Sequence, residues 1–246
     1  MLCRSGVALP VFSAFRSSTL AARRTETAEH VVFGVASDDA MRGAFRRAGQ
    51  FVKMRVRADE GAVHEGIFAI ASAPFEPALS FLVRTNNPAG GEAADRIATM
   101  PIGTPIEVTL PAGEGFALES ARGRDLAMLA VGTALAPVRS ALEVVLRDRK
   151  AYGALSLDYG LRSPSHLPFA ADVERGRSLG VDVALHVGSV RQDGSYEGVR
   201  APDALFDRLG PHAERTVVLA VGHDALVREV RARHAGLVLH NYLLVS

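Results

Sequence analysis

The sequence predicts two domains of different fold class, an antiparallel β-barrel with one helix followed by a doubly wound α/β domain with a parallel sheet. Short apolar strands follow one another up to about residue 116, and strands alternate with helices after residue 124. A polar stretch at 119–124 separates the two patterns. We therefore place a barrel domain at residues 1–120 and an α/β domain at residues 121–246.

The composition is that of an ordinary folded chain. Of the 246 residues, 48% are hydrophobic and 22% are charged, close to the averages for globular proteins. The formal net charge is +1, from 28 Lys and Arg against 27 Asp and Glu, so the chain provides no broad basic field. We therefore expect no nucleic-acid partner. No apolar run approaches the roughly 18 residues that span a bilayer, so we expect no membrane span.

Metal and disulfide chemistry are not expected either. The single cysteine, Cys3, excludes an internal disulfide, a multi-cysteine zinc site and a cysteine-ligated iron-sulfur cluster. The eight histidines do not recur at the spacing of metal ligands, and no nucleophile-elbow motif is present. Any redox chemistry would therefore need an organic cofactor.

The N-terminal segment allows two interpretations. Residues 1–25 contain four arginines, several serines and no acid, which is typical of an organelle transit peptide. The alternative, which we favour, is that residues 7–15 form the first strand of the barrel. We accordingly expect a cytoplasmic protein, with organelle import through residues 1–25 as the alternative.

The barrel half contains short segments rich in Val, Ile and Phe, punctuated by Gly and Pro. The expected strands are residues 30–37, 50–57, 63–72, 78–86 and 104–110. One helix is expected at residues 90–100, where Ala93, Ala94, Ile97 and Ala98 share a face after a Pro-Ala-Gly-Gly turn. Several strands and a single helix favour a small closed barrel.

The second half alternates strands and helices. Strands are expected at 126–132, 153–160, 181–189, 216–222 and 237–245, and helices at 136–149, 166–179, 202–209 and 224–234. The strands are apolar nearly throughout, as expected when helices cover both faces of a sheet. In the first helix, Val138, Ala141, Leu142 and Val145 form a core-facing stripe.

A turn of small residues, Val131-Gly132-Thr133-Ala134-Leu135-Ala136-Pro137, joins the first strand and first helix of the α/β half. Such a turn lets the backbone approach a pyrophosphate, whose charge then meets free N–H groups at the helix start. Proline suits the first helical turn, because its missing N–H has no partner there. An ordinary strand-to-helix turn without a ligand remains the alternative.

Six motifs occur in one order along the chain: Gln50-Phe51-Val52, Ile70-Ala71-Ser72, a Gly-Gly-Glu-Ala helix start at Gly90, the Gly132 turn, Tyr159-Gly160-Leu161-Arg162 and Val221-Gly222-His223. In this order and on these elements, the chain resembles the ferredoxin-NADP reductase family from about residue 28 to the C-terminus. The resemblance implies an FAD-binding barrel, an NAD(P)-binding domain, and hydride transfer between nicotinamide and flavin at their cleft. No side chain is then needed as a catalytic acid or base.

The resemblance also assigns the dinucleotide site. The residues implied are Gly132, Thr133, Ala134, Ala136, Pro137, Tyr159, Gly160, Arg162, Ser189, Arg191, Gly222 and His223. Ala134 stands where the family usually has glycine, and its methyl group is expected to narrow the approach of the dinucleotide. For His223, a cap of the following helix is the competing interpretation. For Arg162 and Arg191, solvated surface charges are the alternative.

The flavin side departs from the family pattern. The residues implied to contact FAD are Phe68, Ala69, Ile70, Ala71, Ser72, Gly90, Gly91, Glu92 and Ala93, with Arg84 as a substitute cation. Gly66 replaces the arginine that binds the FAD phosphate, and Ala69 and Ala94 replace serines. Phe68 keeps an aromatic ring for stacking but has no hydroxyl. We expect FAD to bind less tightly than in a relative with all these contacts.

Two functions follow from these residues. The first is an FAD-dependent NAD(P)H oxidoreductase that passes electrons to a separate acceptor, such as a ferredoxin-like carrier. The alternative is a non-catalytic or regulatory relative with weakened flavin binding. Between NADPH and NADH we favour NADPH, because Ser189 and Arg191 resemble the residues that contact the 2′-phosphate of NADP in the family.

Overall fold

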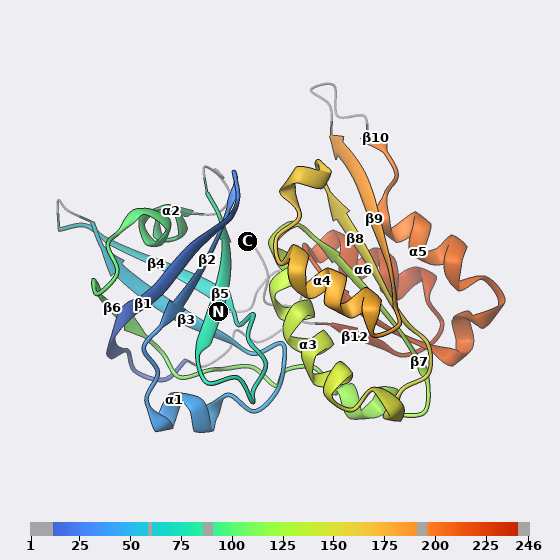
Figure 1. Ribbon diagram of the computed structural model, residues 1–246, viewed down its shortest axis with the longest axis horizontal. Coiled ribbons are helices and arrows are strands. Elements are labelled where there is room, and N and C mark those ends of the chain that lie inside the picture. The colour runs from blue at the N-terminus through green and yellow to red at the C-terminus, as the bar shows by residue number, and fades with distance from the viewer. Residues whose placement is uncertain (1–11, 59–60, 86–90, 191–195, 241–246) are drawn as a thin grey trace.

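Two sheets of six strands each stand side by side in the computed structural model, which describes residues 12–58, 61–85, 91–190 and 196–240 (Figure 1). The first sheet uses residues up to Val108 and the second begins at Asp125. The first is antiparallel, and the second is mostly parallel with helices on both faces. The predicted fold class is confirmed.

The antiparallel sheet curls into a barrel. Its strands are β1 (Arg16–Thr27), β2 (His30–Val35), β3 (Phe51–Arg57), β4 (Val63–Ala69), β5 (Leu79–Arg84) and β6 (Pro105–Val108), in the order β4-β3-β6-β1-β2-β5. A bridge between Ile70 and Phe81 links the two edges. Helix α2 (Gly91–Thr99) packs apolar side chains into the barrel core, and α1 (Asp39–Ala44) begins after the capping carboxylate of Asp38.

The first strand lies later than predicted. Strand β1 pairs with both β2 and β6, so residues 16–25 of the segment with a transit-peptide composition belong to the barrel. The expected strand at 7–15 was wrong for residues 12–15, which have no regular structure, and residues 7–11 lie outside the described residues. Leu20 is the one buried side chain among those described in β1, so the strand has little apolar pattern to predict it.

The α/β domain contains five parallel strands and a short antiparallel one. The strands are β7 (Asp125–Val131), β8 (Leu155–Leu161), β9 (Val181–Val190), β10 (Tyr196–Gly198), β11 (Thr216–Val221) and β12 (Val238–His240), in the order β10-β9-β8-β7-β11-β12. The helices are α3 (Leu135–Arg147), α4 (Ala170–Ser178), α5 (Ala201–Leu209) and α6 (Asp224–Arg233). Strand β10, which the sequence analysis missed, is antiparallel to β9.

The strand order creates a switch point at β7. From β7 the chain passes to β8 and β9 on one side, and then returns to β11 and β12 on the other. Ligands of open α/β sheets bind beyond the carboxyl ends of the strands where the order reverses. We therefore expect a ligand at the carboxyl ends of β7, β8 and β11.

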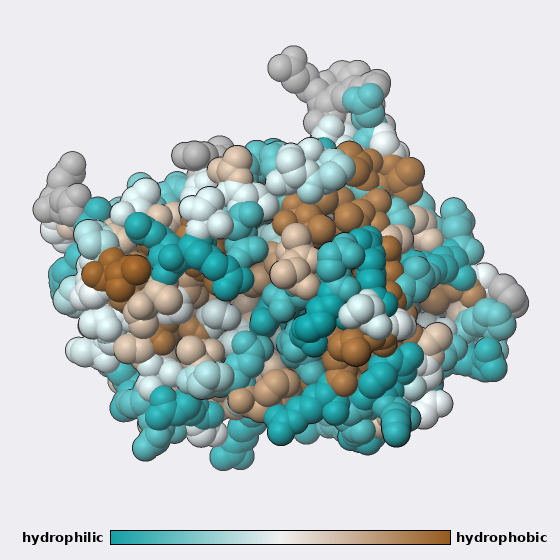
Figure 2. Space-filling view, viewed as in Figure 1, coloured by the Kyte–Doolittle hydropathy of each residue, from teal (hydrophilic) through white to brown (hydrophobic). Residues whose placement is uncertain are grey.

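One hydrophobic cluster crosses from one domain to the other. It joins Val32, Ala71 and Leu82 of the barrel to Met128 and Val138 of the α/β domain. A second cluster lies under α5 and α6 on the opposite face of the sheet. At the surface, hydrophilic residues interrupt the apolar ones on the face shown in Figure 2. Among the described helices, none combines the length and apolar character needed to cross a lipid bilayer.

Arg139 on α3 connects the two domains by partly buried ion pairs. Its guanidinium donates to Asp172 of α4 at 2.9 Å, and to Glu76 and the Ala71 carbonyl of the barrel at 3.0 and 2.9 Å. It also lies over the Phe169 ring. Burial opposes the charge, but the hydrogen bond to Asp172 keeps the pKa of Arg139 above its ordinary value.

A second hydrogen bond ties the same barrel segment to α3. The Ser140 hydroxyl donates to the Ser72 carbonyl at 2.6 Å, and both residues are fully buried. The Ser72 hydroxyl accepts from the N–H of Ser80 on β5. Helix α3, which follows the Gly132 turn, therefore holds the barrel segment that follows β4.

We expect Arg139→Met to lower the free energy of unfolding by about 2 kcal/mol, because it leaves two partly buried carboxylates without their cation. Urea unfolding measures this. The matched control is Arg228→Met, which breaks an exposed pair with Asp224 on α6 and should cost under about 1 kcal/mol. Equal effects of the two substitutions would show that Arg139 does not hold the domains together.

Candidate functional site

A pocket of about 570 Å³ opens at the carboxyl ends of β7 and β8. The α/β domain contributes Gly132, Gly160, Ser189 and His223, among others, and the barrel contributes a wall that includes His30. The pocket therefore lies at the predicted switch point and is closed on one side by the other domain.

The Gly132 turn gives the pocket a glycine floor and a helix start. Gly132 has a φ of +54°, and a Cβ built on it would meet no atom within 4 Å. No side chain caps the start of α3, but the Leu135 N–H already donates to the Gly132 and Thr133 carbonyls, and Pro137 has no N–H. Gly132 is the residue of this turn that lines the pocket, so a ligand meets its main chain. The Ala134 methyl is buried in the shared core, so the expected narrowing by this methyl was wrong. Thr133 is exposed.

Strand β8 supports the turn through its end. The Tyr159 hydroxyl donates to the Gly132 carbonyl at 3.0 Å, and burial raises the pKa of this phenol. Tyr159 is 1% exposed, so it fixes the turn from behind. A Cβ on Gly160 would lie 2.9 Å from Val131 and 3.4 Å from Ala201, so glycine is required for β8 to pack under α5.

Strand β11 ends in a helix cap. His223 accepts a hydrogen bond at Nδ1 from the Leu226 N–H at 3.2 Å, and it also lines the pocket. His223 therefore caps the start of α6 through its Nδ1 atom, as the competing interpretation predicted. A Cβ on Gly222 would lie 3.2 Å from Val131, so this glycine too keeps the strand ends close.

The polar residues at the β9 side of the pocket match the sequence expectation in part. Arg162 is exposed and Ser189 lies in the same pocket, whereas Arg191 lies outside the described residues. Sequence reasoning missed Arg200, which precedes α5 and pairs with Glu229 of α6. Nothing in the local sequence marks Arg200, because its place in the pocket depends on α5 packing over β8.

The residues implied for the flavin are mostly inside the barrel. Ile70, Ala71 and Ser72 have no exposure, so their assignment to the flavin stays a prediction that would have to involve the main chain. Ala69 and Ala93 are buried as well, and Gly90 lies outside the described residues.

Phe68 takes up the space next to Gly66. Its ring packs edge-on against Phe33 and is 8% exposed. A Cβ on Gly66 would lie 2.9 Å from the Phe68 ring and 3.4 Å from Ala93. The ring would have to leave Phe33 before it could stack on an isoalloxazine.

The start of α2 keeps the polar features that fit a diphosphate through the main chain. Gly91 has a φ of +75° and open space beside it. Glu92 in the first turn lies 2.6 Å from His64 Nδ1. The open main chain at Gly91 is compatible with a diphosphate, whereas the Glu92 carboxylate in the same turn opposes one.

The barrel wall of the pocket carries a cation, an acid and a buried imidazole. Arg84 pairs with Glu29 at 2.8 Å and lies opposite His30 in the pairing of β2 with β5. Arg84 was expected on the flavin side, and it faces this pocket. Partial burial opposes ionisation of Glu29, but Arg84 and His166 keep the pKa of its carboxyl below the ordinary value. Burial, and then Arg84, lower the pKa of His30 to about 4.

No group of three or more His, Cys, Asp or Glu side chains that could hold a metal ion occurs in the described parts of the chain. The pocket is instead suited to a ligand that needs close backbone approach, hydrogen-bond donors and a helix start.

Residues 128–232 match the family model of the oxidoreductase NAD-binding domain. Two curated relatives align with about three quarters of the chain. The chain is 27% identical to the electron transfer subunit of an NAD-dependent dihydroorotate dehydrogenase B from Shouchella clausii, and 23% identical to sulfhydrogenase 1 subunit gamma from Pyrococcus furiosus. The alignments cover 76% and 75% of this chain, but only 66% and 61% of those relatives.

Solved structures resemble the whole fold. A ferredoxin-NADP reductase from Neisseria gonorrhoeae, with bound FAD and NADP, has a TM-score of 0.75 at 19% identity, covering 94% of this chain and 100% of that one. The FAD/NAD-binding domain of a nitric oxide dioxygenase from Vibrio cholerae has a TM-score of 0.76 at 14% identity, covering 93% and 98%. The predicted resemblance is confirmed.

The buried His30 predicts a pH dependence of stability. The unfolded chain binds the His30 proton near pH 6.5, and the folded chain binds it only near pH 4. Between these values the unfolded state holds more protons, so the free energy of unfolding falls as the pH falls, by up to about 3 kcal/mol from this group. We expect His30→Phe to flatten the slope of the free energy of unfolding against pH in this window. An unchanged slope in urea titrations would contradict the assignment.

Proposed function

We propose that this chain, which is a ferredoxin-NADP reductase-like protein with an oxidoreductase NAD-binding domain at residues 128–232, is a flavin-dependent NAD(P)H oxidoreductase. The observation that carries the proposal is the pocket between the Gly132 turn and the barrel wall. It lies where the fold binds dinucleotides, and it brings residues of both domains to one ligand.

The chain's own part in this activity is to hold and orient its ligands. The Gly132 backbone binds the dinucleotide diphosphate, while Gly160 and Gly222 keep the strand ends close enough to form the pocket. Tyr159 fixes the turn. The bound nicotinamide and flavin supply the hydride transfer, so no side chain has to exchange a proton with them.

We propose FAD as the flavin, held mainly by the main chain at the start of α2. The reductase from Neisseria gonorrhoeae was crystallised with bound FAD and NADP, and this chain has the same fold. Because Gly66 and Phe68 leave no side-chain cation for the diphosphate, binding is expected to be weaker than with the arginine present.

NADPH is the proposed dinucleotide. Arg162 and Ser189 line the same pocket, and Arg162 has no ion pair with any described residue. A cation and a hydroxyl there suit a 2′-phosphate. Titration of the protein with NADPH and NADH tests this, and tighter binding of NADH would contradict it.

The electron acceptor is proposed to be a separate carrier or a partner subunit. One relative is named an electron transfer subunit, and another is one subunit of a sulfhydrogenase. The compartment is predicted to be the cytoplasm.

The second candidate function is a non-catalytic protein of the same fold. It is supported by Phe68, whose ring fills the space beside Gly66 that a side-chain cation would need in order to reach the FAD diphosphate. The two candidates differ in colour. An oxidoreductase should take up FAD and turn yellow, with a flavin spectrum that NADPH bleaches in the absence of oxygen. Failure to bind added FAD at micromolar concentration would favour the second candidate.

The Gly132 turn predicts a selective loss of dinucleotide binding. Gly132→Ala places a methyl group in the pocket without touching the core, and we expect about a tenfold loss of NADPH affinity with little change in flavin content. Gly123→Ala is the matched control, because Gly123 also has a positive φ and open space but lies outside the pocket. Equal loss of NADPH affinity in both variants would mean that backbone strain, and not ligand contact, is responsible.

The packing of Phe68 beside Gly66 predicts that an arginine at position 66 cannot by itself restore tight FAD binding. Gly66→Arg alone should leave FAD affinity nearly unchanged, because the Phe68 ring occupies the position of the new side chain. The double variant Gly66→Arg, Phe68→Ala should bind FAD about tenfold more tightly. Flavin fluorescence quenching measures this. Higher affinity in the single variant would show that the ring moves aside without cost.

A further inference from the structure

Two histidines, one from each domain, line the pocket and have a buried ring nitrogen without a hydrogen-bond partner. His30 of the barrel is 4% exposed, and its Nε2 atom is buried without a partner. His166 of the α/β domain has a buried Nδ1 atom without a partner. Both residues line the pocket. Buried polar atoms are rarely left unpaired, so a ligand is expected to satisfy them.

The hydrogen bonds around His30 are compatible with a tautomer that donates from its unpartnered nitrogen. Thr27 Oγ1 accepts from the Glu29 N–H at 3.2 Å and lies 2.9 Å from His30 Nδ1. A hydroxyl can donate one hydrogen bond while it accepts others, so Thr27 can donate to Nδ1. In the neutral ring with Nδ1 as the acceptor, the proton is on Nε2, and the unpartnered nitrogen is then a donor.

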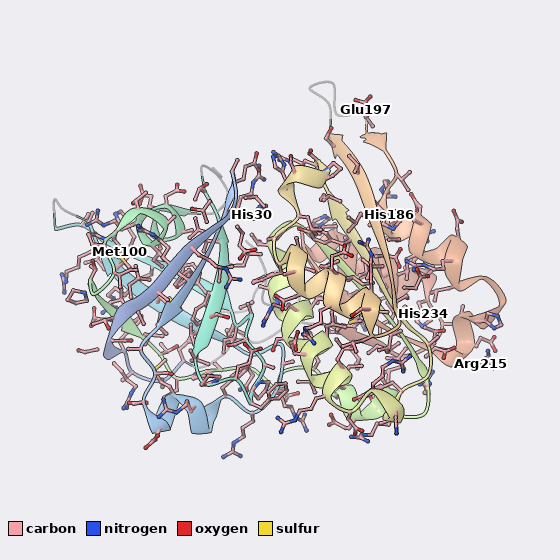
Figure 3. The ribbon with its side chains drawn as sticks, in the orientation of Figure 1. His30, Met100, His186, Glu197, Arg215 and His234 are labelled. Atoms are coloured by element: carbon pink, nitrogen blue, oxygen red, sulfur yellow. The ribbon has the colours of Figure 1, made fainter. Side chains whose placement is uncertain are left out.

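The neighbours of this donor are cationic. Arg84 on the adjacent strand lies opposite His30 in the register, and β5 contacts the turn at Gly132–Ala134. Arg162 lines the same pocket from the other domain. Figure 3 shows His30 on the side of the barrel that faces the α/β domain. This wall thus offers donors and positive charge across from the helix start of α3.

Glu29 is the one acid on this wall among the described residues. Its carboxylate lies 2.8 Å from the Arg84 guanidinium and 3.8 Å from His166 Nε2. It therefore holds the cations that an anionic ligand would use, and an arriving anion must displace it from Arg84.

We propose that His30 and Arg84 form a barrel-side subsite for the diphosphate of the dinucleotide, so that both domains hold the same group. This inference rests on the proposed function and adds two residues of the barrel, His30 and Arg84, to those that bind the dinucleotide. The His30 Nε2–H and the Arg84 guanidinium donate to the phosphate oxygens from one side, and the main chain of Gly132 lies on the other. Thr27 is a positioning residue, since it holds the His30 tautomer. Glu29 competes with the ligand for Arg84.

The first test uses calorimetry with fragments of the dinucleotide. ADP-ribose carries the diphosphate without a 2′-phosphate, and 2′-AMP carries the 2′-phosphate without the diphosphate. We expect His30→Phe to weaken NADP⁺ and ADP-ribose binding by about tenfold and to leave 2′-AMP binding unchanged. Unchanged affinity for ADP-ribose, or a loss confined to 2′-AMP, would overturn the subsite.

The second test predicts opposite signs for neighbouring residues. Thr27→Val should weaken ADP-ribose binding by a few-fold, because the His30 tautomer is no longer held. Glu29→Gln should strengthen it by a few-fold, because the competing charge is removed from Arg84 while the side-chain shape is kept. A purely structural role for the wall would weaken binding in both variants. Weaker binding in Glu29→Gln would overturn the proposal.

The matched control is His234→Phe. His234 is buried and has an unpartnered Nδ1 atom, but it lies outside the pocket and bonds to the Thr216 carbonyl. The His234→Phe variant should bind NADP⁺ and ADP-ribose with the affinities of the wild type. If its affinity for ADP-ribose fell as much as that of His30→Phe, the assignment would be overturned. A wild type that binds neither NADPH nor NADH would refute the proposed function itself, whereas equal binding by wild type and His30→Phe refutes only the subsite.

Discussion

Arg139 pairs with carboxylates of both domains in a partly buried position, and the pocket depends on that pairing. Helix α3 carries the Gly132 turn at one end and Arg139 one turn further on, so the residue that anchors the barrel is rigidly linked to the turn that meets a ligand. An ion pair with one partner removed costs several kcal/mol in such surroundings, whereas surface pairs contribute little. The barrel wall therefore stands at a fixed distance from the helix start, and the two sides of the pocket act on one ligand.

The two ligand regions are prepared differently. On the dinucleotide side the chain provides empty space next to Gly132 and imidazole nitrogens without hydrogen-bond partners. On the flavin side the available space beside Gly66 is filled by the Phe68 ring, which contributes to the barrel core. A ligand on the first side meets preorganised groups, while a flavin on the second must be bound against side-chain packing. This difference in preorganisation changes affinity more than the number of contacts does.

Charges around the pocket occur in opposed pairs. Glu29 neutralises Arg84, and Glu229 neutralises Arg200, so the pocket has only a modest positive field when no ligand is present. Such pairing keeps cations from repelling each other across the domain boundary, and it lets an anion gain affinity by displacing a carboxylate. The net charge of the whole chain, +1, gives no sign of this local arrangement.

The sequence by itself determined the two fold classes, the glycine turn at Gly132 and most strands, because apolar periodicity and small-residue turns act through local backbone geometry. It did not determine β1, whose side chains are mostly exposed, since the strand is held by pairing with distant β2 and β6. Nor did it mark His30 or Arg200 as pocket residues. Only the tertiary structure decided these, because a pocket wall consists of side chains that long-range strand pairing and the packing of one domain on the other bring together.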